Sequence, residues 1–89
     1  MNYKTQKVID MLRQLFEGEY DPLQFSTDFA VYCFDNYEVL EKEHVGLGYY
    51  LDQEVPDICD EAEPGFDSTH MIEELKKVYE KVLEIINQN

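Results

Sequence analysis

Three kinds of side chain in this sequence could do chemistry: two histidines, two cysteines and a dense group of carboxylates. Nucleophilic catalysis needs a nucleophile beside a base, but no recognisable motif surrounds His44 or His70, and we interpret both as surface histidines. Cys33 and Cys59 fall on apolar stripes of expected helices, where a buried, unreactive thiol is the usual outcome. The Gly-Leu-Gly of residues 46–48 lacks the Gly-Lys-Ser/Thr of a phosphate-binding loop. We therefore expect neither an enzyme nor a bound cofactor.

The carboxylates concentrate in residues 53–69, QEVPDICDEAEPGFDST, which contain six acids and no lysine or arginine. Like charges at helical spacing destabilise a helix by about 0.2–0.5 kcal/mol per pair, so folding alone does not account for them. Their spacing does not match a calcium-binding loop, which needs ligands at alternate positions and a central glycine, and we expect no metal site.

We interpret these acids as a binding surface for a basic protein, with neighbouring aromatic side chains as anchors that exclude water. The alternative for the acids is a solvated helix end, and the alternative for the two tyrosines is ordinary core packing. The predicted partner-binding residues are Asp57, Asp60, Glu61, Glu63, Asp67, Tyr49, Tyr50 and Phe66.

The overall charge is consistent with that interpretation. The 89 residues carry a net charge of −13, and seventeen of the 20 acids but only one basic residue, Lys42, lie between residues 14 and 75. Such an excess repels nucleic acid and anionic lipid and attracts a basic partner, although acidity can also serve solubility alone. The first sixteen residues lack the apolar core of a signal peptide, and no segment is apolar enough for a membrane span. We expect a cytoplasmic protein with reduced thiols.

Amphipathic helices must position these side chains. Apolar residues at helical spacing predict a first helix over 3–17, stopped by Gly18. Asp21 as N-cap and Pro22 at the first helical position begin a second helix that runs to about residue 41. Its predicted buried stripe is Phe25, Phe29, Tyr32, Cys33, Tyr37 and Leu40.

Two glycines near residue 47 predict a connection over 42–47, followed by a third helix that is kinked or split at Pro56. A Pro-Gly turn then leads to a last helix capped by Asp67 or Ser68. Its predicted core positions are Ile72, Leu75, Tyr79, Val82 and Ile86. We therefore predict one all-α domain over residues 1–89, a compact antiparallel four-helix bundle.

The segment ICDEAEPGFDSTHMIEELKKVYEKVL resembles the C-terminal half of the bacterial self-protective colicin-like immunity proteins, the family of the colicin D immunity protein. LRQLFEGEYDPLQFSTDF is similar to the family's opening, in which a helix begins with an aromatic-Ser pair, here Phe25-Ser26. The paired tyrosines Tyr49 and Tyr50 resemble, less closely, the paired tyrosines of the DNase-colicin immunity proteins. Gly65 stands where the family tends to have an acid.

This resemblance implies an acidic four-helix protein that binds the toxic nuclease domain made by the same cell, in the colicin D case a tRNA-cleaving one. Matching the Glu-Pro pair implies that Asp60, Glu63 and Asp67 face the basic active site, and Glu61 is added on charge grounds. We expect a monomer that blocks its cognate toxin nuclease domain in a 1:1 complex, with no nucleic acid or membrane as partner. The alternative is an acidic regulatory adaptor or nucleic-acid mimic that sequesters a basic nucleic-acid-binding protein.

Overall fold

The structure, a computed structural model, describes residues 3–88, and this part of the chain forms five α-helices and no strand. The helices are α1 (Tyr3–Phe16), α2 (Pro22–Asp35), α3 (Tyr37–Glu43), α4 (Leu47–Cys59) and α5 (Thr69–Asn87). The all-α prediction is confirmed, whereas the predicted number of four helices is wrong. None of these helices is both long and apolar enough to cross a bilayer.

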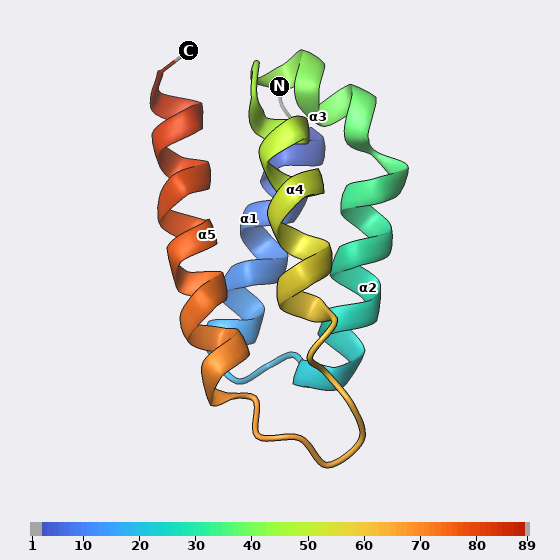
Figure 1. Cartoon of the computed structure of the whole chain (residues 1–89). Helices are drawn as coiled ribbons and strands as arrows, with labels where there is room; N and C mark the ends of the chain where they lie inside the picture. The colour runs from blue at the N-terminus through green and yellow to red at the C-terminus, as the bar shows by residue number, and fades with distance from the viewer. Residues whose placement is uncertain (1–2, 89) are drawn as a thin grey trace.

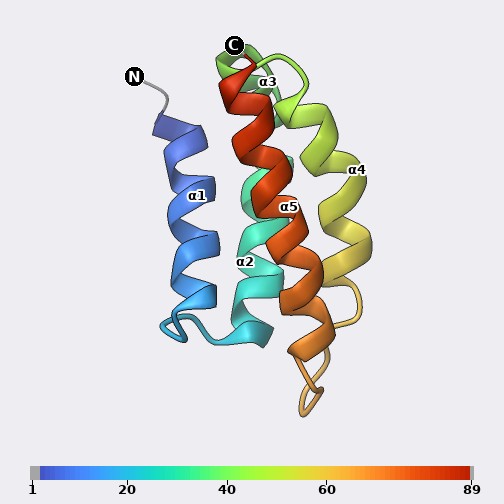
Figure 2. The same ribbon diagram turned by 90° about the vertical axis from the view of Figure 1, so that its left-hand side faces the viewer.

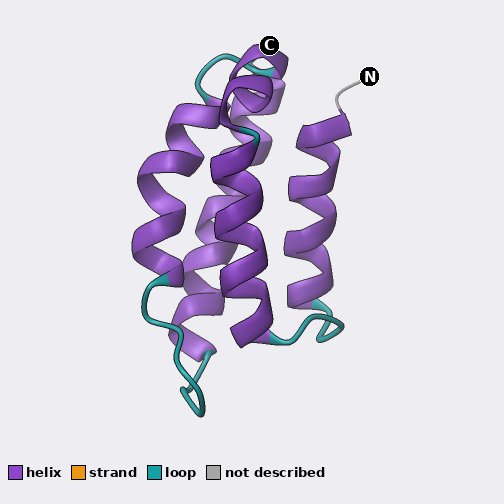
Figure 3. Ribbon diagram, turned by 90° about the vertical axis from the view of Figure 1, so that its right-hand side faces the viewer, coloured by secondary structure: helices purple, strands orange, loops and turns teal. Residues whose placement is uncertain are grey.

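The four longer helices run lengthwise through a molecule of 38 × 21 × 18 Å (Figure 1). Figures 1 and 2 show α1 beside α5 and α2 beside α4, and α3 lies across the end at which α1 begins and α5 finishes. The connections between α1 and α2 and between α4 and α5 lie at the opposite end (Figure 3). The molecule therefore has a short-helix end and a loop end.

Local signals account for the first two helix boundaries. Gly18 has φ 79°, its N–H donates to the Leu15 carbonyl (3.1 Å), and Glu19 N–H donates to the Gln14 carbonyl (2.9 Å). These are the two bonds of a glycine-terminated helix end, as predicted. Asp21 accepts a hydrogen bond from the backbone N–H of Gln24 (3.0 Å), which confirms the predicted cap.

The predicted second helix breaks at Asn36, which separates α2 from α3. Asn36 has φ −110° and ψ 17°, outside helical geometry, and its side-chain amide donates to the Tyr32 carbonyl (2.8 Å). A short amide side chain that bonds to the backbone in this way competes with the helix. The chain turns here, and α3 crosses toward the start of α1.

The third predicted helix, expected to be kinked or split at Pro56, corresponds to α4. The helix is not split at Pro56, which lies inside it, and the Pro56 carbonyl accepts the Asp60 N–H (2.9 Å). Proline cannot donate a backbone hydrogen bond, but Pro56 stands in the last turn of α4, so this loss lies close to the helix end. Cys59 is still helical.

Gly48, expected in or beside a loop, lies in the first turn of α4 and is buried. A Cβ at this position would lie 2.5 Å from the Tyr37 carbonyl oxygen and 3.0 Å from the Glu41 Cβ. Glycine is therefore required here by the close approach of α3 and α4. Gly46, in the preceding connection, has φ 92°, which other residues rarely adopt.

The core contains residues from all five helices, but the apolar stripe of α5 differs from the prediction. Leu75 and Val82 are buried as expected, whereas Ile72, Tyr79 and Ile86 are only half-buried. A parallel row one residue earlier is buried instead, and it consists of Met71, Val78 and Ile85. Both rows flank Leu75 and Val82 at helical spacing, so the positions of α1 and α4 decide which row is covered.

Two carboxylates of α3 bind the starts of two other helices. Glu41 accepts hydrogen bonds from the N–H groups of Gly46 (2.6 Å) and Tyr49 (3.0 Å) at the start of α4. Glu43 accepts from the Thr5 N–H (2.8 Å), the Thr5 hydroxyl (2.6 Å) and the Lys4 N–H (3.3 Å) in the first turn of α1. Helix N-termini leave N–H groups unpaired and favour negative charge, so α3 caps both helices.

These contacts lower the pKa values of both carboxyls below the ordinary 4.5. For Glu41 the main cause is the hydrogen bond from Gly46, followed by that from Tyr49. For Glu43, burial raises the pKa, but the hydrogen bonds from Thr5 and Lys4 outweigh it. A carboxyl whose pKa is lowered by folding stabilises the fold above its unfolded pKa, and this contribution is lost as pH falls through the folded pKa.

Replacing Gly48 by alanine should destabilise the protein. In an open helix position this exchange stabilises by about 1 kcal/mol, but here the new methyl would collide with the Tyr37 carbonyl. We expect Gly48→Ala to lower the free energy of unfolding by about 1–3 kcal/mol, as overpacking does. Urea denaturation measures the change. A gain in stability would show that α3 and α4 are not in close contact at this point.

Replacing the two capping carboxylates should weaken the fold at neutral pH. We expect Glu41→Gln and Glu43→Gln each to lower the free energy of unfolding by about 1 kcal/mol, as loss of a helix cap does. The difference from wild type should shrink as pH falls below 4.5, where the wild-type carboxyls take up protons. Urea denaturation over a pH series tests this, with Glu38→Gln, an exposed position of the same helix, as the control. A pH-independent difference would contradict it.

Candidate functional site

The five acids predicted from the sequence lie together at the loop end of the molecule. Asp57 is in the last turn of α4, Asp60 follows that helix, and Glu61, Glu63 and Asp67 lie in the connection to α5 (Figure 1). All five side chains are exposed. We call these five residues the acidic end.

Two members of the acidic end hold the start of α5. Glu61 Oε2 lies 3.0 Å from His70 Nδ1, and Asp67 Oδ1 accepts from the Thr69 N–H (3.0 Å) and hydroxyl (2.7 Å). The bonds from Thr69, backbone first and hydroxyl second, lower the pKa of the Asp67 carboxyl. Asp67 therefore acts as the cap that the sequence suggested, while Ser68 makes no side-chain cap bond.

The other three acids, Asp57, Asp60 and Glu63, receive no hydrogen bond or ion pair from any side chain between residues 3 and 88. Two of them stand at or beside the last turn of α4, which contains no basic residue. The C-terminus of a helix carries partial negative charge, so carboxylates there are unfavourable by about 0.3–1 kcal/mol each. These three side chains therefore make no hydrogen bond or ion pair among residues 3–88 that would stabilise the fold.

The aromatic residues assigned to this surface are only partly brought to it. Phe66 lies in the same connection, half-buried against the core, and borders a hollow of about 300 Å³ beside the start of α2. Tyr49 and Tyr50 lie in the first turn of α4, and Tyr50 is about 15 Å from Asp60 along the helix axis at 1.5 Å per residue. The assignment of these tyrosines to the same binding surface as the acids stays a prediction. Tyr49 is 59% exposed, and Tyr50 packs partly against the core.

The charge asymmetry of the sequence becomes an asymmetry in space. Six of the seven lysines and arginines belong to α1 and α5, which lie side by side in Figures 1 and 2. Lys42 is the only such residue in α2, α3 and α4, which together carry eight acids. One side of the molecule therefore has mixed charge, and the other side, with the acidic end, is almost purely negative.

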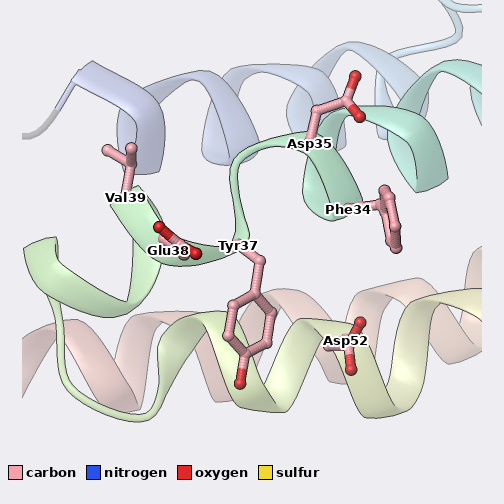
Figure 4. A pocket seen from close by; sticks show the side chains of 6 residues that line it. All are labelled: Phe34, Asp35, Tyr37, Glu38, Val39 and Asp52. Carbon is pink, nitrogen blue, oxygen red and sulfur yellow. The ribbon is translucent and has the colours of Figure 1, made fainter.

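A second surface feature on the acidic side was not predicted. Phe34, at the end of α2, is 75% exposed and borders a hollow of about 500 Å³ between α2, α3 and α4. We call it the Phe34 hollow, and its lining residues are Phe34, Asp35, Tyr37, Glu38, Val39 and Asp52 (Figure 4). The sequence contains one signal for this feature. Phe34 is an aromatic residue that lies off the apolar stripe of its own helix, next to Cys33, which faces the core.

The residues considered for catalysis offer no reactive arrangement. Burial raises the pKa values of both thiols, that of Cys59 to about 12, which keeps them protonated. His44, expected at the surface, is only 8% exposed, because the connection between α3 and α4 folds it inward. His70 is exposed, as expected. Within residues 3–88, no three His, Cys, Asp or Glu side chains are grouped as metal ligands would be.

Comparisons of the chain with protein-family models, with curated proteins and with solved structures give no match. The resemblance to colicin-like immunity proteins therefore stays a prediction that rests on the quoted residues. Three features of the molecule bear on its function: the carboxylates of the acidic end that have no partner among residues 3–88, the one-sided charge and the Phe34 hollow.

Proposed function

We propose that this protein is an immunity protein that binds a bacterial toxin of nuclease type and blocks its basic active site with the acidic end. The observation that carries the proposal is the set of three exposed carboxylates, Asp57, Asp60 and Glu63, that have no hydrogen-bond or ion-pair partner among residues 3–88. Two of them, Asp57 and Asp60, stand at a helix end that disfavours negative charge. Groups that cost stability and serve no contact within the fold are expected where a protein binds something.

Electrostatics favours a basic protein as that partner. A nuclease must attract the phosphates of its substrate, so its active site is rich in lysine and arginine. A protein of net charge −13 is drawn to such a site by the same forces, which raise the association rate at low salt. Because the acids occupy the place of the phosphates, inhibition follows from occlusion and needs no catalysis by the inhibitor.

The arrangement of charge also orients the complex. The mixed charge of α1 and α5 faces away from a basic partner, while α2, α3, α4 and the acidic end face toward it. Arginine and lysine side chains of the toxin can then form charge-assisted hydrogen bonds with carboxylates that have no competing internal partner. We propose that the protein acts as a monomer in the cytoplasm and binds one toxin domain.

The direct test uses the C-terminal domain of the toxin encoded by the adjacent gene. We expect this protein to bind that domain at physiological salt and to abolish its nuclease activity at a 1:1 ratio. The association rate should fall as salt is added, because screening weakens long-range attraction. Calorimetry, stopped-flow mixing and a nuclease assay provide the three measurements. Absence of binding would end the proposal, and binding to a host nucleic-acid-binding protein instead would favour the adaptor alternative.

Charge reversal at the acidic end should separate binding from folding. We expect Asp60→Lys with Glu63→Lys to weaken toxin binding by at least about 100-fold, since loss of one interfacial charge partner costs about 2–5 kcal/mol. Thermal stability should stay close to wild type, because neither side chain has a hydrogen-bond or ion-pair partner in the described part of the chain.

The matched control makes the same change of net charge farther from the acidic end. Glu80→Lys with Glu84→Lys alters two exposed positions in the second half of α5 and should affect the toxin affinity far less. Equal losses of affinity in both double variants would show that net charge alone, and not the acidic end, drives binding. A large loss of stability in the first variant would assign its two acids to the fold.

A further inference from the structure

We propose that the Phe34 hollow is an anchor site for a basic protein segment, and that it receives an apolar side chain flanked by arginine or lysine. The proposal rests on the proposed function only in taking the partner to be a basic protein. It adds a second contact region, outside the acidic end, and names the chemistry that the region recognises.

Phe34 has no role in the core that would explain its presence. The buried face of α2 is formed by Phe25, Phe29 and Cys33, and both of these phenylalanines are fully buried. Phe34 directly follows Cys33 in the sequence, points away from this face and is 75% exposed. Large aromatic side chains contribute strongly to binding when a partner covers them. A phenylalanine that is 75% exposed beside a hollow is therefore typical of a contact surface.

The hollow combines this apolar group with negative charge. Phe34 and Tyr37 both point toward α4 in Figure 4, with Asp52 on that helix below them, and Glu38 and Asp52 flank the tyrosine. Asp35 points away from α4 at the margin. None of the three carboxylates takes part in a hydrogen bond or ion pair with another residue of 3–88, and no lysine or arginine lines the hollow.

An extended segment fits this surface better than a small molecule. A second hollow of about 440 Å³ shares Tyr37 and Glu38 with the first and is also lined by Glu41, Lys42 and Val45, the last 76% exposed. Because Lys42 lines this second hollow, the basic side chains of a partner are expected at the Phe34 hollow, which has no lysine or arginine in its lining. Small-molecule sites enclose most of their ligand, whereas Phe34 and Val45 are both largely in solvent. The adjoining hollows form a strip on which several residues of a partner can lie.

Charge decides between a basic partner and a second copy of this chain. Two copies would bring together two proteins of net charge −13, each with unpaired carboxylates around the same hollow. Like charges across an interface oppose association. A segment with arginine or lysine on either side of its apolar residue satisfies the same carboxylates, and the anchor and the charges then act together.

The Phe34 hollow and the acidic end can belong to one footprint. Asp52 lies on α4 and Asp60 directly follows this helix, eight residues later, which is about 12 Å along the axis at 1.5 Å per residue. An interface of standard size covers about 800 Å² on each partner, which is wide enough to include both. One toxin domain can therefore occupy its active site with the acidic end and place a neighbouring basic segment in the hollow.

The test uses synthetic peptides as probes, so that it does not require the toxin. The peptide Ac-Arg-Leu-Arg-Lys-Phe-Arg-NH₂ is titrated into ¹⁵N-labelled protein at physiological salt, and amide shifts are followed by NMR. We expect saturable shifts at residues 34–39 and 52. A peptide with glycine in place of leucine and phenylalanine, and one with glutamate in place of the basic residues, should produce neither saturation nor this localisation.

Variants then assign the site. Phe34→Ser and Asp52→Lys should each weaken peptide binding by about tenfold or more, as truncation of a binding anchor does. Tyr3→Ser is the matched control, because Tyr3 is 73% exposed and lies outside the hollow. Shifts spread over all acidic surfaces, or equal effects of Phe34→Ser and Tyr3→Ser, would overturn the proposal. So would sedimentation that shows self-association of the protein lost in Phe34→Ser.

The same variants distinguish this proposal from the proposed function. If the toxin domain binds and Phe34→Ser leaves its affinity unchanged, the anchor site is refuted and the immunity function stands. If the peptide binds at the hollow and the toxin domain does not bind at all, the immunity function fails and the site for basic segments stands.

Discussion

The capping of two helices by carboxylates of a third is the interaction on which the rest of this structure depends. Glu43 binds N–H groups at the start of α1, nearly forty residues earlier, and Glu41 binds those at the start of α4. Helix α3 has only seven residues and could not persist alone. It is stabilised because its carboxylates accept hydrogen bonds from N–H groups at the starts of α1 and α4. The same bonds fix the position of α1 relative to α4. The absence of a side chain at Gly48 lets α3 and α4 approach closely enough for this arrangement.

Negative charge thus has two distinct uses in the molecule. Some carboxylates have backbone partners and stabilise the fold, as Glu41, Glu43 and Asp67 do at three helix starts. Others, such as Asp57 and Asp60, have no such partner among residues 3–88 and lie at a helix end that disfavours negative charge. The free-energy cost of the second group is small for each residue, and a basic partner offsets it on binding. This division by use is the physical basis for the function proposed above.

The extent to which the sequence predicts this arrangement varies with the range of the interaction involved. Helix starts and stops at Gly18, Asp21 and Asp67 follow from bonds between residues a few positions apart, and the structure contains them. The division between α2 and α3 was missed, since the apolar stripe continues through it and the amide bond of Asn36 competes only weakly with a helix. Tyr49 and Asp60 are close in the sequence but lie at the two ends of α4, because one is in the first turn of the helix and the other follows its last turn.

The sequence by itself determined the all-helical class, the main helix boundaries, the strong negative charge and the group of acids before α5. These properties depend on composition, periodicity and capping over one or two turns, which are legible in any stretch of chain. Only the tertiary structure decided which acids cap helices and which remain free, which row of α5 is buried, and that Phe34 borders a hollow with Asp52. Each of these outcomes depends on where a distant helix lies, and a contact such as that between Thr5 and Glu43 leaves no local pattern in the sequence.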